Sequence, residues 1–278
     1  MANKANALLS FWQNVKCHKE NGIDTCIAED DYEILKNNNL LTKKLTVHNP
    51  KNKLLYKDLP CEPFVGDIEN AKIYLVTLNP GAKKNEHENW ENKDLLKLRK
   101  NNIKQTNQYP FYYLDPILAK TGGGKYWKRK DRFGGLIEHF SSLVGGKENA
   151  MKLIATNVCD LELCPYHSEE WDEKTNKIIG DLSSVKTMID FLKDKVIPDV
   201  ISGRKSLIVM RSVTKISKFL RNIEFDCNGK KIKFDDLDKE FPENIAFYRT
   251  KELYRFARLN ENTPGGQIIR KQLRKLII

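Results

Sequence analysis

Compact apolar runs separated by amphipathic segments dominate the chain from residue 71 onward. Four of these runs have the length and the flanking residues of buried strands: 71–78, 153–158, 206–210 and 244–248. The first ends at Asn79-Pro80-Gly81, a sequence that favours a sharp turn. Apolar residues at helical spacing lie between or after the runs, notably over 182–196, 213–220 and 267–278.

This alternation predicts an α/β fold, a single three-layer α/β/α domain with a short, about four-stranded parallel sheet. A hairpin over 223–234, with Asn228-Gly229 as its turn, interrupts the third unit. Ligands bind such sheets at the carboxyl ends of the strands. The loops expected to form the site therefore follow Leu78, Val158, Met210 and Tyr248.

The first 62 residues have a different pattern. Leu8, Leu9, Trp12 and Val15 are spaced as on one face of a helix, and residues 32–35 suggest a second helix. We therefore expect an N-terminal helical extension over 1–62, followed by the α/β domain over 63–278.

Charge narrows the class of partner. The chain of 278 residues has a formal net charge of +11, which favours a polyanion such as nucleic acid. Residues 120–132 have a net charge of +5 and residues 249–278 of +6, which together equal the whole excess. The first segment also contains aromatic residues, a combination that suits a DNA-facing surface. The competing interpretation is a solvated basic face. Within residues 120–132, the predicted DNA contacts are Lys125, Trp127, Lys128, Arg129 and Lys130.

Targeting and redox signals are nearly absent. The N-terminus lacks the apolar run of a signal peptide, and no stretch approaches the ~20 apolar residues of a membrane span. The six cysteines are dispersed, so we expect reduced thiols in a cytoplasmic protein. We also expect a monomer that does not bind membranes. Cys159, Cys164 and His167 lack the fourth ligand and the spacing of a zinc site, so no metal is predicted.

Two motifs carry a resemblance to a known family. A strand ending in Leu78-Asn79-Pro80-Gly81, preceded by Gly66-Asp67 and by the residues NAKIYLV, resembles the first motif of the uracil-DNA glycosylase superfamily. The closest branches have Asn at the key position. The segment IATNVCDLELCP resembles that superfamily's second strand, whose Asn reads the flipped base; here that residue is Asn157. The resemblance covers residues 63–278.

The chain also departs from the family pattern. A loop reading RLNENTPGG, residues 258–266, stands where the family usually has a His-Pro-Ser-like or Asn-Pro-Ser-like motif. No Cys-x-x-Cys pair is present, so the iron–sulfur cluster of some branches is not carried over. The resemblance implies no cofactor.

The resemblance implies a monofunctional DNA glycosylase, which extrudes a nucleotide and hydrolyses its N-glycosidic bond. Asn79 would position the attacking water, and Asn157 would hydrogen-bond the base edge. Asp160 and His167 are candidate proton donors beside the second loop. Base contacts would come from Leu78, Pro80 and Gly81, with Phe111 or Tyr112 stacked on the base. Backbone contacts from the fourth loop would come from Arg258, Asn260, Thr263 and Gly265.

The base and the reaction leave alternatives. Uracil is the family default, whereas a hypermodified phage cytosine, such as glucosylated hydroxymethylcytosine, would give an anti-phage role and need a roomier pocket. A non-catalytic nucleic-acid-binding protein on the same sheet is a second class. A metal-dependent nuclease using Asp160 and Glu162 is a third. The plain structural interpretations are a strand-ending turn for Asn79 and core packing for the aromatic cluster at 109–113.

Overall fold

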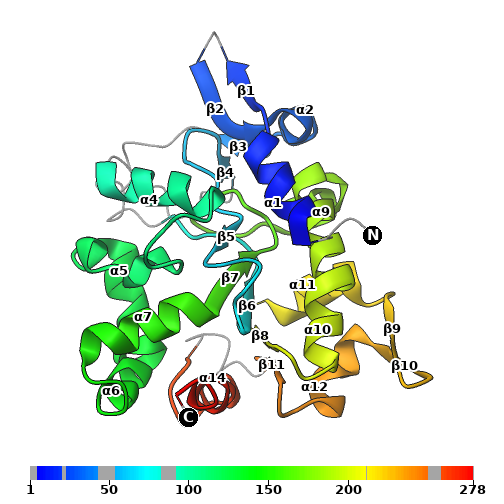
Figure 1. Cartoon of the computed structure of the whole chain (residues 1–278). Helices are drawn as coiled ribbons and strands as arrows, with labels where there is room; N and C mark the ends of the chain where they lie inside the picture. Colours follow the sequence, from blue (N-terminus) through cyan, green and yellow to red (C-terminus); the bar gives the residue numbers. More distant parts are fainter. Residues whose placement is uncertain are drawn as a thin grey trace.

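The computed structural model describes residues 5–20, 23–42, 54–82, 92–210, 212–249 and 258–277. Its centre is a five-stranded sheet with the strand order β11-β8-β6-β7-β5. The strands are β5 (Phe64–Val65), β6 (Ile73–Thr77), β7 (Val158–Glu162), β8 (Ser206–Val209) and β11 (Ile245–Phe247). Figure 1 shows helices on both faces of this sheet, as in an α/β fold.

The sheet is mixed rather than all parallel. Strand β6 pairs in parallel with both β7 and β8, and β11 pairs in parallel with β8. Strand β5 adds an antiparallel edge beside β7. The expected sheet of about four parallel strands therefore has to be corrected, because the two-residue β5 is too short to stand out as an apolar run.

One core lies on each face of the sheet. Along β6, Tyr74 and Val76 belong to one core while Ile73 and Leu75 belong to the other, as the alternation of a strand requires. Helices on the first face are α1 (Ala5–Asn14), α9 (Ser183–Phe191), α10 (Ile197–Ile201) and α11 (Val213–Leu220). Helices on the second face are α4 (Lys93–Ile103), α5 (Gly122–Trp127), α6 (Gly135–Ser141), α7 (Lys147–Asn157) and α14 (Pro264–Arg274).

The N-terminal region is not purely helical, contrary to the prediction for 1–62. After α1 come the antiparallel strands β1 (Cys17–Glu20) and β2 (Ile23–Ala28), then α2 (Glu29–Asn37). The short parallel strands β3 (Leu41–Thr42) and β4 (Leu55–Tyr56) follow. Leu8, Trp12 and Leu35 lie in the same core as Val185 and Met188 of α9, so this region helps to form the first core.

The second predicted strand, over residues 153–158, is wrong, because most of these residues belong to a helix. Residues 153–157 form the end of α7, and β7 begins only at Val158. The buried residues Ala150, Met151, Ile154 and Ala155 follow the helical period, which a six-residue apolar window does not distinguish from a strand.

The predicted hairpin is confirmed. Strands β9 (Glu224–Cys227) and β10 (Lys230–Lys233) form a hairpin whose turn is Asn228-Gly229, both with positive φ. The remaining short helices are α8 (Glu173–Ile178) and α12 (Leu237–Glu240).

Within the described ranges, no helix has the length and apolar character that crossing a membrane requires.

Candidate functional site

A pocket of about 320 Å³ opens where β6 and β7 end. It is lined by residues 77–81, by the second half of β7, and by residues 167–171. Helices α4 and α5 supply the opposite wall, and residues that follow β8 complete it. The carboxyl edge of the sheet, which the strand pattern predicts as the ligand site, therefore holds the cavity, whose volume falls in the ~300–1,000 Å³ range of small-molecule sites.

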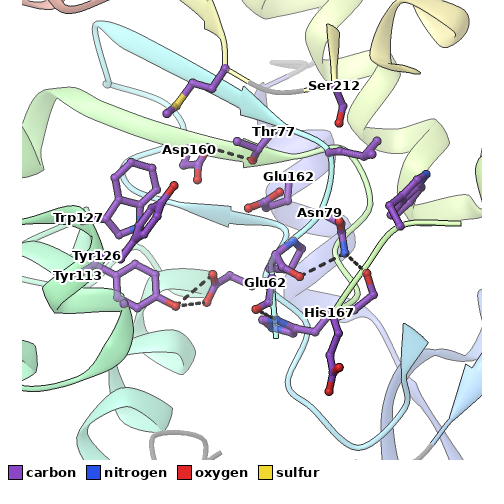
Figure 2. Close-up of a pocket in the computed structure, with 18 of the residues that line it drawn as sticks. Glu62, Thr77, Asn79, Tyr113, Tyr126, Trp127, Asp160, Glu162, His167 and Ser212 are labelled. Atoms are coloured by element: carbon purple, nitrogen blue, oxygen red, sulfur yellow. Dashed lines mark hydrogen bonds between the residues drawn. The ribbon is translucent and has the colours of Figure 1, made fainter. Parts of the chain in front are cut away.

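Asn79 ties together the two loops that leave β6 and β7. Its Nδ2 donates hydrogen bonds to the carbonyl of Pro80 at 3.2 Å, the carbonyl of Tyr166 at 3.1 Å and Oγ of Ser168 at 2.9 Å (Figure 2). Gly81 and Ser168 form a parallel bridge beside it. The amide N–H₂ of Asn79 is thus directed at the protein, and Oδ1, on the other side of the amide, faces away from these acceptors.

Two carboxylates on β7 face the pocket. Asp160 and Glu162 are buried and line it, whereas Cys159 and Leu161, which alternate with them, lie in the first core. The hydroxyl of Thr77 donates to Oδ1 of Asp160 at 3.3 Å. Strand alternation therefore gives the pocket an acceptor-rich wall.

A buried ionic network closes the pocket on the α4 side. Oε2 of Glu62 lies 2.8 Å from NH2 of Arg99 and also accepts hydrogen bonds from Tyr112 at 2.6 Å and Tyr113 at 2.9 Å. Burial by itself would raise the pKa of the Glu62 carboxyl, but the Arg99 guanidinium and the hydroxyl donors hold the pKa below its ordinary value. Glu62 is therefore ionised at neutral pH.

His167 lines the pocket as a neutral imidazole. Its Nδ1 lies 3.2 Å from the carbonyl of Gly81, and the backbone of Pro60 is a second hydrogen-bond partner of the ring. Burial, together with the positive charge of Arg99, lowers the pKa of His167 to about 4. The depressed pKa leaves little imidazolium at pH 7, which weighs against the proton-donor role predicted for His167, and the Nδ1 contact holds its loop against Gly81.

The aromatic wall differs from the predicted one. Phe111 packs edge-on against Trp127 and Phe133 in the second core, and Tyr112 is fully buried on Glu62. Neither residue lines the pocket, so the predicted stacking residues are wrong. The aromatic residues that do line it are Tyr113, Tyr126, Trp127 and Trp171.

Asn157 lies at the wrong end of the sheet for the role predicted for it. It is the last residue of α7, directly before β7, and its Nδ2 donates back to the carbonyl of Leu153 at 2.8 Å. The pocket begins at Asp160 and Glu162 on the same strand, and a strand rises ~3.3 Å per residue. Asn157 is therefore separated from the pocket because the strand starts later than its sequence indicates.

The predicted DNA-contacting residues divide into exposed and engaged side chains. Lys125 and Lys130 are exposed, and Lys125 is on α5, the helix that gives Trp127 to the pocket. Arg129 is also exposed but forms a double contact with Asp131, at 2.9 and 3.0 Å. Lys128 is half-buried and donates to a main-chain carbonyl at 3.2 Å. Exposed lysines thus accompany the helix that forms one wall of the pocket.

The fourth loop starts a helix. The hydroxyl of Thr263 accepts a hydrogen bond from the backbone N–H of Gly266 at 3.2 Å and caps α14. A Cβ on Gly265 would come within 2.6 Å of the Tyr248 hydroxyl, so that position requires glycine for packing. Asn260 accepts from Thr263 through its carbonyl, and Arg258 is exposed. None of these residues lines the pocket, and residues 250–257 lie outside the described ranges.

Sequence reasoning missed several pocket residues. The sequence gives no apolar period or motif that points to Glu62, Arg99 or Trp171. Tertiary packing alone places them around the same pocket. Tyr113 is adjacent to Tyr112, the predicted stacking residue. The aromatic cluster therefore indicates that an aromatic side chain lines the pocket, but not which of its side chains points there. Among the described residues, no group of three or more His, Cys, Asp or Glu side chains is arranged to hold a metal ion.

Comparisons with protein-family models, curated proteins and solved structures return no match for this chain. The uracil-DNA glycosylase resemblance therefore stays a prediction from the sequence.

Proposed function

We propose that this protein is a monofunctional DNA glycosylase that takes an extruded base into the pocket and hydrolyses its N-glycosidic bond. The observation that carries the proposal is that Asn79 and Asp160 line one cavity whose opposite wall is aromatic. Aromatic walls can stack on an extruded base, because every base has a π-face.

The chemistry assigns these groups separate tasks. During hydrolysis, the oxygen of a water bonds to the sugar C1′ while the C1′–N bond breaks and its electron pair leaves with the base. Positive charge develops on the sugar, and a carboxylate beside it lowers that barrier. We assign this task, together with acceptance of the water's proton, to Asp160. Oδ1 of Asn79 holds the water, because Nδ2 is already engaged with the protein.

The surface beside the pocket supports a DNA substrate. Lys125 is exposed on the same short helix that gives Tyr126 and Trp127 to the wall. A phosphate bound there would leave its nucleotide near the pocket, while the carboxylates inside would repel phosphate groups. The base is therefore the part of the nucleotide that suits the cavity, while the phosphate stays outside.

Two kinds of base are candidate substrates. Uracil and a hypermodified cytosine, including the glucosylated form, are both carried as candidates, the first implying repair and the second defence against phage. A cavity of about 320 Å³ has room for more than a bare pyrimidine ring, which favours a base with a substituent.

The deciding experiment is an abasic-site assay in EDTA followed by alkali. The DNA panel contains uracil, hypoxanthine, 5-hydroxymethylcytosine and its glucosylated form. We expect alkali-labile breaks on at least one substrate, with the rate reduced about 10²–10⁴-fold in Asp160→Asn and strongly reduced in Asn79→Ala. Asn157→Ala is the matched control for Asn79→Ala, and it should keep the wild-type rate because Asn157 lies at the other end of β7.

Other outcomes identify the competing functions. Tight, salt-sensitive binding without breaks on any substrate would replace the proposal with a non-catalytic nucleic-acid-binding protein. Strand cleavage that requires a divalent cation and is lost in EDTA would indicate the metal-dependent nuclease, in which Asp160 and Glu162 hold the metal.

A further inference from the structure

Two arginines of α14 converge on one histidine of α6. The NH2 nitrogen of Arg270 lies 3.4 Å from Nδ1 and 3.3 Å from Nε2 of His139. The NH2 nitrogen of Arg274, one helical turn later, lies 3.3 Å from the same Nε2. The two NH2 atoms can therefore be no further apart than twice that last distance, although both guanidiniums carry a positive charge.

Among the residues that the structure describes, neither guanidinium forms an ion pair with a carboxylate. Lys271, which lies between the two arginines in the sequence, does form one, with Glu243. Like charges four residues apart on a helix destabilise that helix. The helix thus neutralises one cation and keeps two arginines together without an acidic partner.

His139 does not supply the missing acceptors. A neutral imidazole has one acceptor nitrogen with a single lone pair, whereas each guanidinium has several N–H donors. Burial, and then the charges of Arg270 and Arg274, lower the pKa of His139, and the carboxylate of Glu261 opposes them only in part. The imidazole is therefore neutral at pH 7. An anion placed beside it would accept hydrogen bonds from both arginines.

The cluster lies away from the pocket. Gln272, between the two arginines in the sequence, donates hydrogen bonds to Oγ of Ser206 at 2.9 Å and to Oδ1 of Asn244 at 3.3 Å. Ser206 is the first residue of β8, and Asn244 directly precedes β11, so this part of α14 is at the amino edge of the parallel strands. The pocket is at their carboxyl edge. A nucleotide whose base occupies the pocket therefore does not account for the arginine cluster.

We infer that Arg270, Arg274 and His139 form a binding site for a phosphate group, separate from the pocket. Arginine matches a phosphate well, because its planar fork presents parallel N–H donors to two oxygens. Bonds of ~2.7–2.9 Å to different oxygens of one phosphate can bridge guanidiniums that lie this close together. Two sources carry such a group, a nucleic-acid backbone and a small phosphorylated molecule. The inference goes beyond the proposed function and does not rest on it.

The test follows the imidazole of His139 by NMR. Its signal is identified by its absence from the spectrum of His139→Gln. The wild-type protein is titrated at pH 7 with inorganic phosphate and, separately, with sodium chloride at matched ionic strength. We expect phosphate to shift the His139 signal saturably and chloride to leave it nearly unchanged. An equal response to the two salts would overturn the inference, because a solvated basic face responds to ionic strength alone.

Variants that remove one charge locate the site. Arg270→Gln and Arg274→Gln should each weaken phosphate binding roughly fivefold or more, because each removes charge-assisted hydrogen bonds to the anion. Lys275→Gln removes the same charge from the exposed end of α14, and it should change the affinity less than about twofold, since salt screens an exposed charge. Equal losses in all three variants would contradict a specific site. The wild-type comparison of the two salts does not require any variant to fold.

A second ligand identifies the source of the phosphate. A short DNA duplex with ordinary bases is titrated under the same conditions. If the backbone is the source, the duplex shifts the His139 signal at a lower concentration than inorganic phosphate does, and both arginine variants weaken this response. A response to phosphate alone supports a site for a small phosphorylated molecule. No saturable response to either ligand overturns the inference and leaves the glycosylase standing, because none of these measurements depends on base excision.

Discussion

Replacing Arg99 with leucine should cause a large loss of stability, because the guanidinium neutralises a carboxylate inside the protein. Arg99 and Glu62 are each only 7% exposed, and their closest atoms are 2.8 Å apart. Removing one partner of a buried pair leaves an uncompensated charge, which costs about 3–5 kcal/mol. At ~2 °C per kcal/mol for a large domain, Tm should fall by roughly 6–10 °C.

The assay is urea unfolding at pH 7, followed by circular dichroism. Arg129→Leu is the matched control, because Arg129 also contacts an aspartate, Asp131, but is 56% exposed. That surface pair should contribute less than about 1 kcal/mol. Adding Glu62→Gln to Arg99→Leu should restore part of the loss, since the buried group is then uncharged. Equal losses in the two single variants, or no recovery in the double variant, would refute the argument.

The dependence on pH provides a second check with a defined sign. In the wild type the pKa of Glu62 is below its unfolded value of ~4.3, so its contribution to stability is present above that pH. The contribution is lost as pH falls through the folded pKa. Without Arg99, burial raises the pKa of Glu62, so the variant should gain stability relative to wild type between pH 7 and pH 4. A stability difference that is constant over this range would contradict the assignment.

Four further predictions use other parts of the structure. Gly265→Ala should lower stability by ~1–3 kcal/mol in thermal unfolding, because its Cβ has no space, and an unchanged Tm would contradict the packing. Gly81→Ala should keep the wild-type Tm, since no atom lies within 4 Å of its Cβ, but should slow base excision if the base approaches that loop. Stability should fall by about 3 kcal/mol between pH 6.5 and 4 because buried His167, with a pKa of about 4, resists protonation; His167→Gln should flatten this slope. Lys125→Ala and Lys130→Ala should each reduce the slope of log affinity against log salt by ~0.9, and an unchanged slope would remove that residue from the phosphate contacts.

The strands that the sequence identifies correctly are those buried on both faces. The run from Ile73 to Thr77 is apolar without a break and ends at a proline-glycine turn, so its period and its boundary agree. Strand β7 is hidden because Asp160 and Glu162 interrupt its apolar character. The apolar run before β7 predicts a strand there, although it belongs to the buried face of α7.

The candidate site was predictable where it follows a strand. The turn after β6 is visible in the sequence, and it carries Asn79 and Gly81 into the pocket. Asp160 is close to the end of the neighbouring strand, which the sequence locates within a few residues. The pair of Glu62 and Arg99 was not predictable, since its partners are 37 residues apart and neither belongs to a motif. Tertiary packing alone brings them together.

The placement of Asp160 and Glu162 argues for function rather than for architecture. A strand in the middle of a sheet is stabilised by apolar side chains on both faces, and β7 follows this rule with Cys159 and Leu161 on one side. On the other side it carries two buried carboxylates in place of apolar side chains, and taking a carboxylate out of water has a desolvation cost. A fold keeps such a local conflict where the groups have a task, and both carboxylates lie at the carboxyl edge, where parallel sheets bind their ligands. The same reasoning predicts that Asp160→Asn and Glu162→Gln alter base excision without unfolding the protein.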